Sequence, residues 1–199
     1  MNHLLSPQIG LETNVDDISN YLKFQDLSDV ILVSASYAGM VTTTVADRIP
    51  ERIGALIYQN AFIARDGVSQ HDILPPRRRE MIDRELAETG DGWLMPPPDP
   101  AFIGVTDAND IAWIAARMTA QSARTFRDRP RITGACERVA HNTYIRATGY
   151  PNPTFDGYVT MAETTPGWHT ETLDTSHDAM ITAPDDIVRI LLGVADAIG

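Results

Sequence analysis

Two short apolar runs joined by a helical pattern constrain the fold of this chain more than any other feature. Residues 29–33 (DVILV) and 53–58 (IGALIY) are rich in β-branched side chains and almost free of polar ones, as in parallel strands that are covered on both faces. Between them lie a turn of small residues (34–39) and a helical segment (40–48) that Pro50 ends. This order predicts a βαβ unit, and therefore an α/β fold with a parallel sheet flanked by helices.

Two further runs extend the predicted sheet. Residues 143–148 (TYIRAT) and 168–173 (WHTETL) are expected to be its third and fourth strands. A helix over 13–22 precedes the first strand, and Pro184 opens a final helix whose apolar residues recur at helical spacing. The segment from 149 to 157 is rich in Pro and Gly, so we interpret it as a loop.

The middle of the chain has a different pattern. Helical patterns over 77–89 and 107–118 are separated by consecutive prolines at 96–98, which exclude a helix interior at that point. Because sheet-like runs lie on both sides, we interpret residues 66–131 as a helical cap insertion within a single domain that spans residues 1–199.

The composition excludes several classes of partner. Lys and Arg number 16 and Asp and Glu number 27, which gives a formal charge of −11. Such an acidic chain lacks the basic surface that binds nucleic acid. No run approaches the roughly 20 apolar residues of a membrane span, and residues 1–7 do not have the order of a signal peptide. With Cys136 as its single cysteine, the chain is expected to be cytoplasmic.

The turn after the first predicted strand carries the clearest chemical signal. It reads SASYA over residues 34–38, with Ser36 between small residues at a strand-to-helix junction. A sharp turn there exposes the serine hydroxyl at the top of the sheet, and the helix N-terminus offers backbone N–H groups to a developing oxyanion. The turn departs from the G-x-S-x-G pattern at both glycines, where Ser34 and Ala38 stand.

Several separate segments extend this signal along the chain. They are residues 3–7 (HLLSP), 29–41 (DVILVSASYAGMV), 46–53 (ADRIPERI), 90–93 (GDGW), 125–126 (TF) and 177–180 (HDAM). Together they resemble the α/β-hydrolase superfamily, and more narrowly the bacterial esterases related to plant hydroxynitrile lyases and methyl esterases. The resemblance covers essentially the whole chain but only the later part of that fold. It therefore implies a partial α/β-hydrolase fold from which the early strands are absent.

The resemblance also implies roles for individual residues. Ser36 matches the nucleophile, and His177, in a loop between the last strand and the C-terminal helix, matches the general base. The backbone N–H of Tyr37 would be one oxyanion donor. The other donor comes in this fold from a His-Gly loop after an earlier strand, which this sequence does not contain.

The acid of the catalytic triad is not at either of its usual places. The fold puts it after the third strand seen here, at Tyr150, or after the preceding strand, at Asn60, and neither is acidic. Asp156, in the predicted loop with Tyr150, is our preferred replacement. Asp66 is the second choice. A carboxylate is needed there to fix the tautomer of the histidine and to stabilise the imidazolium.

The cap segment suggests the class of substrate. The pocket is expected to be lined by Trp93, Phe102 and Trp113, which favours a small apolar ester, and the negative charge of the chain would repel anionic substrates. The resemblance implies no organic cofactor. No pair of histidines has the spacing of metal ligands, so no metal is expected.

The missing early strands have a consequence for assembly. In this fold a strand would pair beside residues 30–33, so its absence leaves an apolar strand at the edge of the sheet. Exposed apolar edges pair readily with other chains. We therefore expect either a homo-oligomer that forms through this edge or a truncated product of a longer gene.

The sequence thus predicts a serine hydrolase that cleaves small apolar carboxylic esters through an acyl-enzyme. The alternative is a catalytically degenerate or truncated α/β-hydrolase that acts as a binding or interaction protein. A third and lower-ranked hypothesis is an enzyme similar to hydroxynitrile lyases. Such a lyase needs an additional cation in the pocket, and the single lysine of the chain is Lys23.

Overall fold

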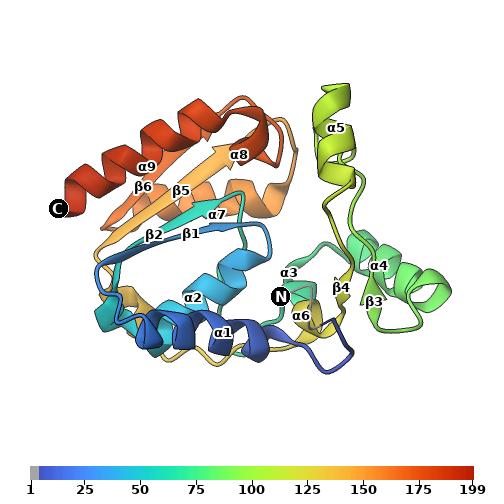
Figure 1. Cartoon of the computed structure of the whole chain (residues 1–199), viewed down its shortest axis with the longest axis horizontal. Coiled ribbons are helices and arrows are strands. Elements are labelled where there is room, and N and C mark those ends of the chain that lie inside the picture. Colours follow the sequence, from blue (N-terminus) through green and yellow to red (C-terminus); the bar gives the residue numbers. More distant parts are fainter. Residues whose placement is uncertain (1–4) are drawn as a thin grey trace.

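A parallel four-stranded sheet forms the centre of the protein (Figure 1). The computed structural model describes residues 5–199, so His3 of the first resembling segment lies outside the described residues. The strand order is β1-β2-β5-β6. The strands are β1 (Val30–Ala35), β2 (Ile53–Gln59), β5 (His141–Ala147) and β6 (Trp168–Leu173). All four predicted strands are confirmed, and with them the α/β class.

Helices cover both faces of this sheet. α1, α2 and α7 pack on one face and α9 packs on the other. Their bounds are α1 (Leu11–Phe24), α2 (Ala38–Arg48), α7 (Pro153–Thr164) and α9 (Pro184–Ile198). The shorter helices of this part are η2 (Pro50–Arg52), η3 (Ala135–Arg138) and α8 (Ala179–Thr182).

The side chains of each strand point alternately to the two faces of the sheet, so the hydrophobic core has two layers. Tyr58 and Tyr144 are buried against α2 and α7, whereas their neighbours Ile57 and Ile145 are buried against α9. Successive side chains of a strand point to opposite faces, so an apolar run such as that of β2 serves both layers at once. This explains why β2 contains so few polar residues.

The segment between β2 and β5 lies beyond the end of the sheet toward which the strands point (Figure 1). It contains α3 (Gln70–Ile73), α4 (Pro76–Thr89), β3 (Leu94–Met95), α5 (Ala108–Ala115), β4 (Gln121–Ser122) and α6 (Arg124–Arg127). Its two ends are bonded together. Gly67 N donates to Pro130 O (2.9 Å), and Ile132 N donates to the Asp66 carboxylate (2.9 Å). The chain thus leaves the sheet and returns to it at one point.

The prediction of a loop over residues 149–157 is wrong for its second half. α7 begins at Pro153, which puts Asp156 in the first turn of a helix. Pro153 lacks the amide hydrogen that a first helical residue leaves unpaired, and its φ suits a helix start. The side chain of Asn152 completes this start, since its Oδ1 accepts a hydrogen bond from Thr154 N (3.0 Å).

The hydrogen bond between Asn152 and Thr154 provides a test of how α7 begins. Asn152→Ala removes the acceptor for Thr154 N, so we expect the free energy of unfolding to fall by about 1 kcal/mol in urea denaturation. Asn109→Ala, at an exposed asparagine of α5 whose side chain makes no hydrogen bond within residues 5–199, is the control and should change the stability little. Equal losses in the two variants would contradict the capping role.

Candidate active site

Ser36 occupies a strained turn between β1 and α2. Its φ is 52°, in the left-handed region that side chains other than glycine rarely adopt. Two bonds to its carbonyl maintain this conformation, because Ser36 O accepts from Phe62 N (3.0 Å) and from Gly39 N (3.2 Å). Strained backbone of this kind persists only where surrounding contacts fix it, and it is concentrated at functional sites.

Close packing explains the small residues around Ser36. A Cβ atom on Gly39 would lie 2.1 Å from Phe62 O, so only glycine fits there. Ser34 stands at the first glycine of the usual pattern; it is buried, and its Oγ donates to Ile57 O (3.1 Å). The departure at Ser34 is therefore accommodated by a hydrogen bond to the neighbouring strand.

Tyr37 follows Ser36 at the N-terminus of α2. The first N–H groups of a helix have no partner within it, and among residues 5–199 no hydrogen bond from Tyr37 N is found. The phenol is anchored, since its oxygen accepts from Asn14 Nδ2 (2.9 Å) and its ring lies 5.9 Å from that of Phe126. Burial raises the pKa of Tyr37 above its ordinary value, so the phenol stays protonated.

His177 lies between β6 and α8 and is only 7% exposed. Its amide donates to Ile103 O (2.9 Å), and its carbonyl accepts from Gln59 Nε2 (2.8 Å). The imidazole stacks on Phe155 (5.7 Å between ring centres, 6° between planes) and lies 5.1 Å from the ring of Tyr150. Backbone bonds and aromatic contacts therefore fix the base.

Gln59 brings Ser36 and His177 to the same corner of the sheet. In the register of the two strands, Gln59 of β2 pairs with Ala35 of β1, and Ser36 is the next residue. The same glutamine holds the carbonyl of His177. The sequence-predicted nucleophile and base thus approach the carboxyl end of β1 and β2 from two distant parts of the chain.

The imidazole of His177 has no carboxylate beside its buried nitrogen. Nδ1 is buried and has no hydrogen-bond partner within the described part of the chain. Burial, and secondly the positive charge of Arg146, lower the pKa of His177 from 6.5 to about 4. His177 is therefore neutral at neutral pH, the form that a general base requires.

Arg146, at the carboxyl end of β5, occupies the region where the acid was expected. It is 6% exposed. Its Nε donates to Asp156 (2.8 Å), and its Nη1 donates to Asn60 Oδ1 (3.2 Å), to Tyr150 O (3.2 Å) and to Ala147 O. Both expected acid positions, Tyr150 and Asn60, therefore contribute oxygen atoms to a guanidinium.

Neither of the two candidates for the triad acid, Asp156 and Asp66, forms a hydrogen bond with His177. Asp156 pairs with Arg146, and its side chain is 63% exposed. Asp66 is exposed and accepts from Ile132 N at the base of the insertion. The assignment of the acid thus stays a prediction for Asp156.

The three predicted pocket residues have different surroundings. Phe102 packs against Tyr150 (6.1 Å between ring centres), which itself contacts His177, so Phe102 adjoins the site. Trp113 is 50% exposed on α5 and lies under the guanidinium of Arg117. Trp93 precedes β3, where its carbonyl accepts from Ala123 N (2.6 Å).

Sequence reasoning missed the residues that support His177. Gln59 and Arg146 are buried polar side chains at the carboxyl ends of two strands. A polar residue directly after the apolar run 53–58 was the available signal for Gln59, because parallel sheets place functional groups at that end. Phe155 lay in the segment that was interpreted as a loop.

Two negative findings apply to residues 5–199. These residues contain no group of three or more His, Cys, Asp or Glu side chains that could hold a metal ion. None of their helices is long and apolar enough to cross a membrane.

Comparisons with known proteins agree with this geometry. No protein-family model matches the sequence. The chain is 29% identical over 197 residues to a carbendazim hydrolyzing esterase of Nocardioides sp. strain SG-4G, and the match covers 95% of this chain and 81% of that protein.

Two solved structures share the fold. One is an extracellular α/β-hydrolase from a Paenibacillus species, described as a structural and functional homologue of tobacco salicylic acid binding protein 2 (TM-score 0.78, 18% identity, 95% of this chain and 81% of that chain). The other is tomato methylketone synthase I (TM-score 0.72, 13% identity, 96% and 80%).

The parallel sheet with its strained serine turn has the α/β-hydrolase fold. In sequence the chain is similar to a bacterial esterase, and in fold it is similar to the Paenibacillus hydrolase. The predicted fold class and family resemblance are both confirmed.

The buried imidazole makes stability depend on pH. Between pH 6.5 and about 4 the unfolded chain binds a proton on His177 that the folded chain does not, so stability falls as the pH drops through this window. We expect the wild type to lose about 3 kcal/mol more than His177→Gln between pH 7 and 4.

Urea unfolding at a series of pH values would measure this difference. Asn109→Ala, at an exposed asparagine of α5, should keep the pH dependence of the wild type. If His177→Gln loses stability as steeply as the wild type, His177 is not the group responsible.

Proposed function

We propose that the chain hydrolyses small apolar carboxylic esters through an acyl-enzyme formed on Ser36. The observation that carries this proposal is the corner at which Gln59 holds the His177 loop beside the residue that precedes Ser36. A strained serine and a neutral buried imidazole at that corner are the two groups that acyl transfer needs. The relationship to an esterase supports the same reaction class.

Each group has a defined step in this reaction. Ser36 Oγ attacks the ester carbonyl while His177 takes its proton, and the carbonyl oxygen becomes an oxyanion beside Tyr37 N–H. His177 then gives the proton to the departing alcohol, which leaves the acyl group on Ser36. Water, deprotonated by His177, attacks this acyl group, and His177 returns the proton to Ser36 Oγ as the carboxylic acid is released. One oxyanion donor contributes about 3 kcal/mol to such a transition state.

Asp156 acts on His177 indirectly in this proposal. Its carboxylate pairs with Arg146, whose positive charge disfavours the imidazolium that forms during the reaction. Asp156 would offset that charge and so ease proton transfer to His177. Asp156 is then a positioning residue, whereas direct orientation of the imidazole would require its carboxylate to leave Arg146.

The insertion 66–131 would act as a cap that shapes the substrate pocket. Phe102 presents an apolar ring next to Tyr150 at the site, and we assign Trp93 and Trp113 to the wider cap surface. The formal charge of −11 disfavours anionic substrates at long range. The esterase relative is described as a carbendazim hydrolyzing esterase, which supports hydrolysis as the reaction.

One observation favours the alternative of a binding protein without activity. The buried Nδ1 of His177 has no carboxylate partner in the described chain, and a cation lies near it. An α/β-hydrolase that had lost catalysis would retain the fold with such a site. The lyase hypothesis gains no comparable support, since Lys23 is exposed in the last turn of α1.

Covalent labelling separates the enzyme from the binding protein. A fluorophosphonate probe should modify the wild type at Ser36, Ser36→Ala should abolish labelling, and His177→Ala should slow it by about 10²- to 10⁴-fold. Ser28→Ala, at an exposed serine, is the control and should label normally. Mass spectrometry locates the adduct. A folded wild-type chain that takes no label would favour the binding protein.

A second experiment tests the role of Asp156. We expect Asp156→Asn to lower kcat/KM for a p-nitrophenyl ester by about tenfold or less, because the carboxylate acts through Arg146. The acid limb of the pH profile should move to lower pH, since the unpaired guanidinium further disfavours protonation of His177. Asp66→Asn is the control. A loss near the roughly 10⁴-fold of a direct triad acid would contradict the indirect role.

A further inference from the structure

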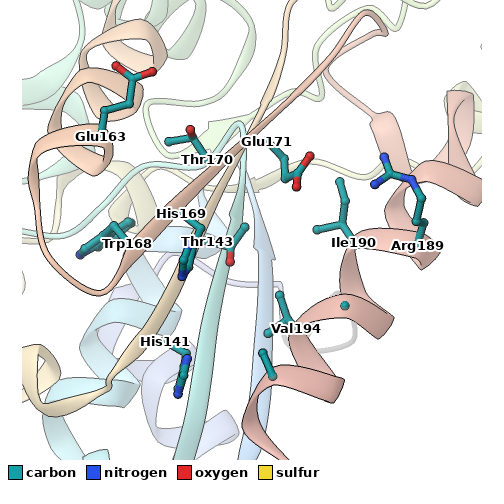
Figure 2. A pocket seen from close by; sticks show the side chains of 12 residues that line it. His141, Thr143, Glu163, Trp168, His169, Thr170, Glu171, Arg189, Ile190 and Val194 are labelled. Atoms are coloured by element: carbon teal, nitrogen blue, oxygen red, sulfur yellow. The ribbon is translucent and has the colours of Figure 1, made fainter.

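A groove lies beside the edge strand β6, at the opposite edge of the sheet from β1. It has a volume of about 630 Å³ and is lined by four consecutive residues of β6 (168–171), by His141 and Thr143 of β5, and by residues of α7 and α9. Figure 2 shows Glu163 of α7 on one side of the strand and Arg189, Ile190 and Val194 of α9 on the other. The groove thus leaves the edge strand β6 accessible, and an accessible strand edge can receive another extended strand.

The hydrogen bonds of β6 define which backbone groups face this groove. Asn142 N donates to Gly167 O (3.0 Å), and Thr148 N donates to Leu173 O (2.9 Å). Odd-numbered residues of β6 therefore direct their N–H and C=O toward β5. Even-numbered residues direct theirs outward, as a strand alternates. Thr170 and Thr172 thus present both groups to the groove, and Trp168 presents its carbonyl, since its amide donates to Thr165 O.

The side chains of β6 are self-complementary when two copies of the strand run antiparallel. With Thr170 on the twofold axis, Thr170 lies opposite the partner's Thr170, and Trp168 lies opposite the partner's Thr172. Both pairs join outward-facing residues, as a hydrogen-bonded pair requires. His169 then lies opposite the partner's Glu171, in a non-hydrogen-bonded pair, where side chains are closest. An imidazole, which can donate a hydrogen bond, and a carboxylate, which accepts one, thus face each other twice.

We propose that the chain forms a twofold symmetric dimer in which β6 pairs antiparallel with β6 of a second copy, centred on Thr170. Thr170 N–H of each chain donates to the carbonyl of the partner's Thr170, and Thr172 N–H donates to the carbonyl of the partner's Trp168. Two four-stranded sheets become one continuous sheet. The two His169–Glu171 pairs set the register.

The composition of β6 agrees with a paired edge. Natural sheets protect free edges with Lys, Pro or bulges, and residues 168–173 contain no Lys or Pro and pair with β5 without a register shift. Edge strand β1, where the sequence predicts self-association, has an exposed Val33 but contains no charged residue or histidine that could pair with a second copy. Pairing at β1 stays a prediction, which the experiment below separates from pairing at β6.

Charge reversal at the proposed interface tests the dimer and its register. Wild type should sediment as a dimer in analytical ultracentrifugation. His169→Glu places like charges opposite each other twice and should raise the dimer Kd about tenfold or more. The double variant His169→Glu/Glu171→Lys restores opposite charges and should recover the wild-type Kd. Both positions line the solvent-accessible groove, so the monomer fold is not at risk.

Backbone variants and hydrogen exchange give an independent readout. Thr170→Pro removes the central donor and should yield a monomer, and the amides of Thr170 and Thr172 should exchange faster in His169→Glu than in the wild type. Ser36 labelling should be the same in all these variants, so this proposal and the proposed function fail separately. A monomeric wild type would overturn the dimer. A dimer unaffected by His169→Glu and Thr170→Pro would place the interface elsewhere, with β1 as the first position to examine.

Discussion

The hydrogen bond from the Gln59 side chain to the His177 carbonyl is the contact on which the candidate site depends. It joins the loop after the last strand to the carboxyl end of β2, and the pairing of Gln59 with Ala35 extends this link to the turn that carries Ser36. Both residues are almost fully buried, where a hydrogen bond has no competition from water and an unpaired carbonyl would be costly. The position of the His177 loop beside the turn of Ser36 is therefore built into the sheet.

The charge pattern around that contact differs from a triad. A buried guanidinium is stable only when its donors are satisfied, and Arg146 obtains this from Asp156, Asn60 and two backbone carbonyls. The region that would hold an acid thus holds a cation with its own counter-ion. Burial and this cation keep His177 neutral. A neutral base suits proton abstraction, whereas the imidazolium formed afterwards depends on how well Asp156 balances Arg146.

The sequence predicted the fold better than it predicted the support of the site. Apolar β-branched runs identified β1 and β2 because both faces of a parallel sheet are buried, runs rich in β-branched and aromatic residues identified β5 and β6, and the small-residue turn identified Ser36. Gln59 and Arg146 follow no periodic pattern, since their burial results from contacts with residues more than eighty positions away. α7 was missed because Pro and Gly suggested a loop, although Asn followed by Pro is also the signature of a helix start.

The cap is attached to the base as well as to the sheet. The amide of His177 bonds to Ile103 of the insertion while its carbonyl bonds to Gln59 of the sheet. Beside this contact, Gly104 packs so closely that a Cβ atom would lie 2.6 Å from Gly149 O. Residues 103–104 cannot move away without releasing one of the two bonds that hold the loop of His177. In the proposed enzyme, a movement of the insertion at this contact would therefore also displace the general base.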